Sequence, residues 1–273
     1  MSYPAEITNE LAAAGPGQFR KFERYRSRFL LTERDLIVYV PGIYQRRADL
    51  RFPVLYMQDG QNLFDPATSF GGVAWRMGET ADRLIAAGSI QPLLIVGIYN
   101  TGKQRIREYT PSRAPKTAGG GANRYRRMLI EEIKPFIESE FRTLPGPQHT
   151  GIGGSSLGGL LTLYVGLRFP RIFGKMAALS PSIWWDKRWI VNFAAGSNIK
   201  SRPRIWLDSG TQEGQHTADD NRRMRDVLLK KGWREGQDLL YMEIQGGQHK
   251  EAAWADRVGP FLQFLFPSGE PEV

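Results

Sequence analysis

A serine placed between two glycines is the feature of this sequence that most directly suggests chemistry. Residues 153–159 read Gly-Gly-Ser-Ser-Leu-Gly-Gly, so Gly154 and Gly158 stand two positions to either side of Ser156. In a nucleophile elbow, a serine on a sharp turn between a strand and a helix has its hydroxyl exposed. Glycines remove the side chains that would collide where the backbone doubles back. The pattern predicts that Ser156 is a nucleophile, although Gly-x-Ser-x-Gly also occurs in ordinary loops.

The histidines that follow Ser156 are candidates for the general base. A serine hydroxyl is a weak nucleophile near neutral pH, so it needs a base that is itself oriented by a carboxylate. In hydrolases built around this elbow, the chain order is serine, then acid, then histidine. His249 stands between the last expected strand and the last expected helix, whereas His216 lies in a polar loop and His149 precedes the serine. We therefore expect His249 to be the base.

The acid is expected in the segment 205–214, which ends a strand. Glu213 lies on the loop beyond the turn at Gly210, from which its long side chain can reach toward His249. Asp208 is closer to the strand, where the pleat sets the direction of its side chain. We favour Glu213 and keep Asp208 as the alternative. Each of them has the competing interpretation of an ordinary solvated carboxylate.

Ester hydrolysis also requires donors aimed at the oxyanion that develops in the transition state. One expected donor is the backbone N–H of Leu157, which follows the nucleophile. The second is expected from the turn after the apolar run 54–58, at Gly60 or Gln61. Gly60 would allow the backbone to approach the substrate closely. We interpret Asp59, which precedes the serine, as a brace of that turn.

The elements that must position these residues alternate along the chain. Apolar runs separated by helical periodicity predict an α/β protein with a mostly parallel sheet and helices on both faces. Strands are expected at 36–40, 54–58, 93–98, 151–154, 176–179, 205–208 and 240–244, with an antiparallel opening strand within 19–29. Helices are expected at 79–87, 125–141, 157–168, 219–231 and 252–265.

Two stretches interrupt this alternation and are expected to form the walls of a cleft. Residues 101–123 contain prolines and three consecutive glycines, which predicts a long mobile loop, and residues 180–202 form an aromatic-rich excursion between strands. The aromatic side chains in or near these stretches have two open interpretations, an acyl or aromatic subsite and a buried core. They are Trp75, Tyr109, Trp184 and Trp185.

Length and composition limit the organisation and the function classes. A chain of 273 residues with 41% hydrophobic content favours one domain, expected at 19–268 after an extension (1–18) and before a tail (269–273). The absence of cysteine excludes disulfides and thiolate zinc sites, and three dispersed histidines suggest no metal cluster, so we expect no cofactor. No apolar run is long enough to span a membrane and no leader is recognisable, so we expect a soluble, cytoplasmic protein.

The net charge of +9 raises the possibility of nucleic-acid binding. The basic residues are not arranged in a repeated basic and aromatic pattern, so we interpret them as a solvated surface and expect neither a nucleic-acid nor a membrane partner. The expected partner is a small-molecule ester, and the oligomeric state is left open.

Five segments occur in the order seen in the putative-esterase family. They are 56–64 (YMQDGQNLF), 107–111 (REYTP), the elbow at 153–159, 180–185 (SPSIWW) and 246–249 (GGQH). From about residue 29 to 266 the chain resembles this family, which includes esterase D, enterochelin-esterase and feruloyl-esterase relatives and, more distantly, mycolyltransferases. The resemblance implies the α/β-hydrolase fold with Ser156 and His249 in the site. Family members place their acid in a Gly-Thr-x-Asp/Glu turn, here 210–213, which strengthens Glu213.

The function that these observations favour is hydrolysis of a carboxylic ester through an acyl-enzyme on a serine, histidine and acid triad. The expected substrate is a small ester or one of the sugar or siderophore type, and the resemblance does not choose among them. Two enzymatic alternatives use the same triad, acyl transfer to another alcohol and peptidase activity. A catalytically silent binding protein with this fold is the alternative from a different class.

Overall fold

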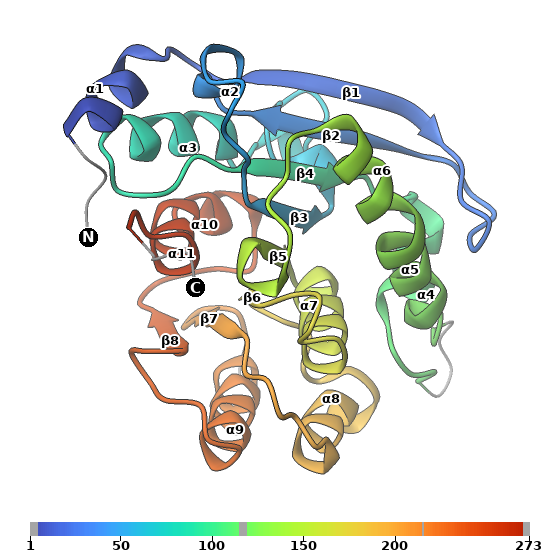
Figure 1. Cartoon of the computed structure of the whole chain (residues 1–273). Coiled ribbons are helices and arrows are strands. Elements are labelled where there is room, and N and C mark those ends of the chain that lie inside the picture. The colour runs from blue at the N-terminus through green and yellow to red at the C-terminus, as the bar shows by residue number, and fades with distance from the viewer. Residues whose placement is uncertain (1–4, 115–118, 215, 270–273) are drawn as a thin grey trace.

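An eight-stranded sheet forms the centre of the protein in the computed structural model, which describes residues 5–114, 119–214 and 216–269. The strands follow one another in the order β1-β2-β4-β3-β5-β6-β7-β8, from top to bottom in Figure 1. Their bounds are β1 (Gln18–Tyr25), β2 (Arg34–Val40), β3 (Val54–Gln58), β4 (Leu94–Ile98), β5 (Thr150–Ser155), β6 (Lys175–Leu179), β7 (Arg204–Gly210) and β8 (Leu239–Ile244). β2 pairs antiparallel with β1 and β4, and the other pairs are parallel. The expected α/β class with a mostly parallel sheet is confirmed.

The central strands are apolar because both of their faces are covered. β3, β4, β5 and β6 are buried along their whole length, which explains the nearly continuous apolar runs of the sequence. β1 is an edge strand and is largely exposed. It ends at Tyr25 and not near Phe29 as expected, because Tyr25 pairs with Arg34, the residue at which β2 begins.

The carboxyl ends of the parallel strands meet at one edge of the sheet. Gln58 is in register with Ile98, Ser155 with Leu179, and Leu179 with Asp208. The loops that follow β3, β4, β5, β6 and β7 therefore open side by side. This is the edge at which open α/β sheets bind ligands.

The expected helices are present, but two of them are interrupted. Their bounds are α1 (Ala5–Ala13), α2 (Ile43–Arg46), α3 (Met77–Ala86), α4 (Arg105–Tyr109), α5 (Ala122–Met128), α6 (Lys134–Glu140), α7 (Leu157–Arg168), α8 (Trp185–Gly196), α9 (Thr217–Lys230), α10 (Glu251–Ala255) and α11 (Val258–Leu265). A π-helical turn (Leu129–Ile133) joins α5 to α6, so the expected helix 125–141 is interrupted. The expected helix 252–265 is divided into α10 and α11. Short 3-10 turns lie at Gly60–Asn62, Phe70–Gly72, Gly102–Gln104 and Pro147–His149.

Two stretches that were expected to be irregular contain helices. Within 101–123 the chain forms α4, which buries Glu108 and Tyr109, and residues 115–118 lie outside the described part. Within 180–202 it forms α8, whose buried residues Ile190 and Ala194 are four positions apart. That spacing is a helical signal that the cluster of tryptophans obscured.

Two groups of helices cover the sheet. α3 contacts α1 and α11, while α4 contacts α5 and α7 and α8 contacts α7 and α9. In Figure 1, α3, α10 and α11 lie on the left of the view and α4 to α7 on the right. α1 is attached to the domain through its contact with α3, and its Leu11 is buried in the core. None of the described helices has the length and apolar character needed to cross a membrane.

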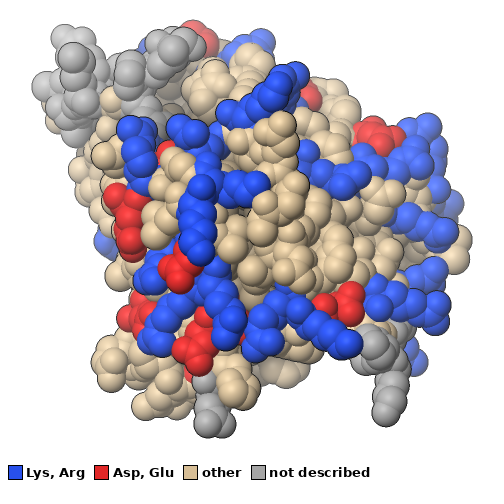
Figure 2. Space-filling model, turned by 90° about the horizontal axis from the view of Figure 1, so that it is seen from below, with Lys and Arg blue, Asp and Glu red and all other residues tan. Residues whose placement is uncertain are grey.

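Many of the basic side chains are paired with acids on the surface. Figure 2 shows the molecule from below, on the side of α8 and α9, where Lys and Arg form bands with Asp and Glu among them. Arg222 of α9 binds Glu243 on the surface, and the partly exposed Arg188 of α8 binds Asp220, which is buried. These ion pairs agree with the interpretation of a solvated basic surface.

Candidate active site

Ser156 stands on a strained turn between β5 and α7. Its φ and ψ are 56° and −120°, a region that residues with a side chain rarely adopt. The turn is held by hydrogen bonds from Ser156 N to the carbonyl of Leu179 (3.0 Å) and from Ser182 N to the carbonyl of Ser156 (2.9 Å). A Cβ on Gly154 would lie 3.0 Å from the side chain of Gln58, and one on Gly158 would lie 3.1 Å from it. A side chain at either position would press against Gln58, which agrees with the glycines that the sequence has on both sides of the serine.

His249 lies between Ser156 and Glu213. Its Nε2 is 2.9 Å from Ser156 Oγ, and its Nδ1 is 3.1 Å from Glu213 Oε2. The side chain of His249 is 40% exposed, whereas that of Glu213 is fully buried. The imidazole and the ring of Trp254 are nearly perpendicular (82°), with their centroids 4.9 Å apart. A histidine contacted in this way by a hydroxyl and a carboxylate can accept the proton of the serine.

The second oxygen of Glu213 is held by three other groups. Oε1 accepts hydrogen bonds from Gly210 N (2.7 Å), Ser180 Oγ (2.6 Å) and Arg257 Nη2 (3.1 Å). Burial alone would raise the pKa of Glu213, but the hydrogen bonds from His249 and these three groups outweigh it and lower the pKa below the ordinary value. Glu213 is therefore ionised at neutral pH, as a carboxylate that orients a histidine must be.

Asp208, the alternative acid, is oriented away from this arrangement. It is fully buried and accepts hydrogen bonds from Trp206 Nε1 (2.6 Å), Ser180 N (3.0 Å) and Arg257 Nη1 (2.7 Å). Burial raises its pKa, while the charge of Arg257 opposes this effect. Asp208 positions Arg257, and Arg257 in turn holds Glu213. The structure therefore brings Glu213, and not Asp208, to His249.

The loop after β3 supplies one side of the site. Gln61 lines the cavity that contains Ser156, whereas Gly60 does not. A Cβ on Gly60 would lie 2.4 Å from the carbonyl carbon of Gly97, so the glycine is required for packing against β4. Leu157 begins α7, and the first N–H groups of a helix have no partner within it. Of the two residues named for this loop, Gln61 lines the cavity, and it stays the predicted donor that would accompany Leu157.

Asp59 fixes the conformation of this loop. It has a positive φ of 57° and is buried. Its carboxylate accepts two hydrogen bonds from Arg105 (2.8 and 2.7 Å) and one from Asn100 Nδ2 (2.7 Å), and its N–H donates to Tyr109 Oη (3.2 Å). Asp59 is therefore the brace that the sequence predicted.

A cavity of about 480 Å³ opens at the serine. It is lined by Asp59, Gln61, Asn62, Thr68, Phe70, Asn100, Gly102, Arg105, Ser155, Ser156, His249, Glu251 and Trp254. None of the four aromatic residues named from the sequence is among these described lining residues. Most of these residues have polar side chains, and Phe70 and Trp254 add apolar surface, so the cavity offers a substrate both hydrogen bonds and apolar contacts.

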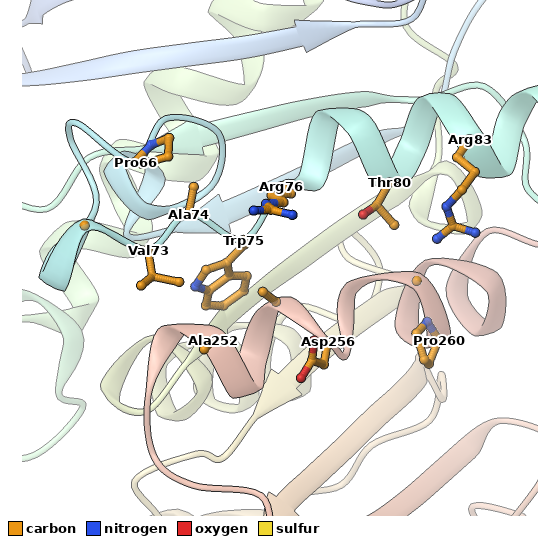
Figure 3. Close-up of a pocket in the computed structure, with 13 residues that line it drawn as sticks. Pro66, Val73, Ala74, Trp75, Arg76, Thr80, Arg83, Ala252, Asp256 and Pro260 are labelled. Carbon is orange, nitrogen blue, oxygen red and sulfur yellow. The ribbon is translucent and has the colours of Figure 1, made fainter.

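Three of the four aromatic residues belong to the core. Trp75 and Tyr109 are almost completely buried, and Trp185, also buried, donates from Nε1 to the carbonyl of Ser112 (3.1 Å). Trp75 lines a second cavity, between α3 and α10, where it lies between Val73 and Ala252 (Figure 3). The subsite interpretation of these three residues is therefore corrected to the core interpretation. Trp184 is 58% exposed and remains a prediction as a substrate contact.

Several residues around the site were not identified from the sequence. Ser180 Oγ donates to Glu213 and accepts from Trp254 Nε1 (3.0 Å) and Arg257 Nη1 (2.8 Å). Ser182 Oγ lies 3.3 Å from Ser156 Oγ. The segment 180–185 was noticed as a motif, which was a signal for both serines. Nothing in the sequence indicated a role for Arg257, because a single arginine between helices is ordinarily a surface residue.

Among the described residues, no three His, Asp or Glu side chains form a group that could hold a metal ion. His216 is exposed at the start of α9, and His149 is partly buried before β5. Neither of them is among the residues that contact Ser156 or line its cavity.

Comparison with known proteins identifies the family and a shared fold. A family model described as "Putative esterase" matches residues 27–263. The uncharacterised protein YbbA of Bacillus subtilis is 26% identical over 250 residues, which cover 85% of this chain and 92% of that protein. The ferri-bacillibactin esterase BesA of the same organism is 29% identical over 197 residues, covering 64% of this chain and 65% of BesA. The crystal structure of the BES protein from Bacillus cereus has a TM-score of 0.74 at 23% identity, covering 91% and 94% of the two chains, and shares the fold.

Proposed function

The chain belongs to the Putative esterase family and is a carboxylic ester hydrolase, and we propose that it works through an acyl-enzyme formed on Ser156. The observation that carries this proposal is the unbroken set of contacts from Ser156 Oγ through both ring nitrogens of His249 to Glu213 Oε2. A serine, a base and an orienting carboxylate in this arrangement perform acyl transfer on several unrelated folds.

In the first step, Ser156 Oγ attacks the carbonyl carbon of the ester while His249 Nε2 takes the hydroxyl proton. The carbonyl oxygen becomes an oxyanion, which the N–H groups of Leu157 and Gln61 stabilise. His249 then gives its proton to the oxygen of the leaving alcohol, and the acyl group remains on Ser156. Glu213 stays ionised and stabilises the imidazolium that exists between the two proton transfers.

In the second step, water replaces the alcohol. His249 takes a proton from the water molecule, the hydroxide attacks the acyl carbon, and the acid leaves as Ser156 recovers its proton. All of the groups that these steps require come from this chain. The reaction as written therefore needs no metal ion or organic cofactor.

The substrate proposed on this basis is a small ester, or one of the siderophore or sugar type. Relatives bearing the name ferri-bacillibactin esterase support the siderophore class, and others named feruloyl esterase support an aromatic acid linked to a sugar. The cavity beside Ser156 suits both classes, because its polar side chains can meet the hydrogen-bonding groups of either and Phe70 and Trp254 can meet their apolar parts.

A fluorophosphonate probe tests the acyl-enzyme proposal directly. We expect the folded wild-type protein to be labelled at Ser156, as located by peptide mass spectrometry, and to hydrolyse p-nitrophenyl acetate. Ser156→Ala should prevent labelling, and both Ser156→Ala and His249→Ala should lower kcat by roughly 10⁴-fold or more. His216→Ala, at an exposed histidine outside the cavity, is the matched control and should retain wild-type turnover. Labelling at another residue, or turnover by Ser156→Ala, would refute the proposal.

A further inference from the structure

The cavity beside Ser156 contains a carboxylate that the proposed triad does not use. Glu251 is the first residue of α10, two positions after His249, and it lines the cavity together with Ser156 and His249. Its Oε1 accepts a hydrogen bond from Asn62 Nδ2 (2.9 Å). Glu251 thus lies between the histidine segment and the loop after β3.

The charge of Glu251 is not balanced by the other residues of the cavity. Arg105 is the one Lys or Arg among the described lining residues, and it forms a bidentate ion pair with Asp59. Within the described part of the chain, Glu251 accepts hydrogen bonds from the neutral amide of Asn62 and from its own backbone N–H, and it forms no ion pair. The cavity therefore has an excess of one negative charge, although the protein as a whole has a net charge of +9 and a surface rich in Lys and Arg (Figure 2).

The surroundings of Glu251 oppose its ionisation. Burial, to which the charge of Asp59 adds, raises the pKa of Glu251 above the ordinary value, while the hydrogen bond from its own backbone N–H, Arg105 and His249 act in the opposite direction. A carboxylate in such surroundings gains from a hydrogen-bond donor or a cation and is disfavoured further by another anion.

The chemistry of the first step indicates which part of the substrate meets Glu251. His249 Nε2 donates its proton to the leaving oxygen, so the alcohol portion of the ester must lie beside the 249–251 segment. We propose that Glu251 makes the alcohol site selective for alcohols that carry a hydroxyl or ammonium group, and selective against alcohols that carry a carboxylate. This inference rests on the proposed function and narrows its substrate class.

Four acetate esters test the selectivity, with the released acetic acid measured by titration at constant pH. They are acetylcholine (cationic), glycerol monoacetate (hydroxylic), 3,3-dimethylbutyl acetate (the neutral isostere of acetylcholine) and 4-acetoxybutanoate (anionic). We expect wild-type kcat/KM to be higher for the first two than for the neutral ester, and lower for the anionic one. Glu251→Gln keeps the acceptor for Asn62 but removes the charge. It should bring two ratios of kcat/KM, cationic to neutral ester and anionic to neutral ester, closer to one by roughly fivefold. This change corresponds to about 1 kcal/mol.

Two further variants separate the charge at the site from general effects. Glu79→Gln removes a charge from the exposed face of α3, outside the cavity, and should leave both ratios as in the wild type. Glu251→Asp retains the charge and should retain the direction of each preference. Wild-type ratios near one, or the same ratios in Glu251→Gln and wild type, would overturn the inference while hydrolysis dependent on Ser156 still supported the proposed function. If Ser156→Ala hydrolysed the four esters as the wild type does, both would fail.

Discussion

Arg257 binds Glu213 on the oxygen that His249 does not use: Arg257 Nη2 lies 3.1 Å from Oε1, while His249 Nδ1 lies 3.1 Å from Oε2. Arg257 is itself buried, and its Nη1 is bound to Asp208 at 2.7 Å. The two carboxylates of the segment 205–214 thus have different tasks. Asp208 pairs with the buried cation, and Glu213 contacts the histidine that we propose it orients.

Replacing each carboxylate by its amide should separate these tasks. Glu213→Gln removes the charge that would stabilise the imidazolium, so we expect kcat on p-nitrophenyl acetate to fall by roughly 10³- to 10⁴-fold. Asp208→Asn leaves the contact between His249 and Glu213 in place, so kcat should fall much less, while the free energy of unfolding should decrease. Steady-state kinetics and urea unfolding check both. A larger loss of kcat in folded Asp208→Asn than in Glu213→Gln would show that the acid is misassigned.

Removing Arg257 should destabilise the protein through the carboxylates that remain. Arg257→Met retains much of the side-chain volume but leaves Asp208 and Glu213 without their buried cation, so we expect a loss of about 3–5 kcal/mol in the free energy of unfolding. Adding Asp208→Asn should restore part of this loss, because it removes one of the unpaired charges. Urea unfolding of the single and double variants measures the coupling. Strictly additive effects would contradict the proposed charge compensation.

The stability of the protein should depend on pH partly through Glu213. Its pKa in the folded state is below the ordinary value of 4.5, so its stabilising contribution is fully present above that pH and is lost as the pH falls through the lowered pKa. Glu213→Gln should therefore flatten the decline of the free energy of unfolding below about pH 4.5. Because the pKa of Asp208 is raised, its contribution to the free energy of unfolding changes with pH in the opposite direction. Asp208→Asn should therefore not flatten the decline at low pH. Unfolding measured from pH 3 to 7 tests this; equal slopes for Glu213→Gln and wild type would count against it.

A methyl group at Gly60 should disturb the loop that carries Gln61. Its Cβ would lie 2.4 Å from the backbone of Gly97, so the loop must shift. Because displacement of an oxyanion donor costs roughly 10²- to 10³-fold in kcat, we expect Gly60→Ala to lower kcat strongly. Gly196→Ala is the matched control, since a Cβ there would meet no atom within 4 Å. Wild-type kcat in a folded Gly60→Ala variant would argue against this role for the loop.

The strands and the positions of Ser156 and His249 could be predicted from the sequence because both depend on local rules. Buried parallel strands must be apolar along their length, and a sharp turn around a serine requires glycine on both sides. The parallel arrangement then brings the residues after β3, β5, β6 and β7 to one edge. Chain order was therefore enough to place His249 near Ser156.

The sequence by itself thus determined the fold class, the strained serine and the order in which its partners follow. Only the tertiary structure decided which carboxylate reaches His249, because that depends on the direction of side chains and on Arg257, which is far from Asp208 in the sequence and bound to it in space. The tertiary structure likewise decided that Trp75, Tyr109 and Trp185 are core residues and that Glu251 lies in the cavity. The sequence alone does not distinguish an aromatic or acidic residue of the core from one of the site, because packing determines which of the two it contacts.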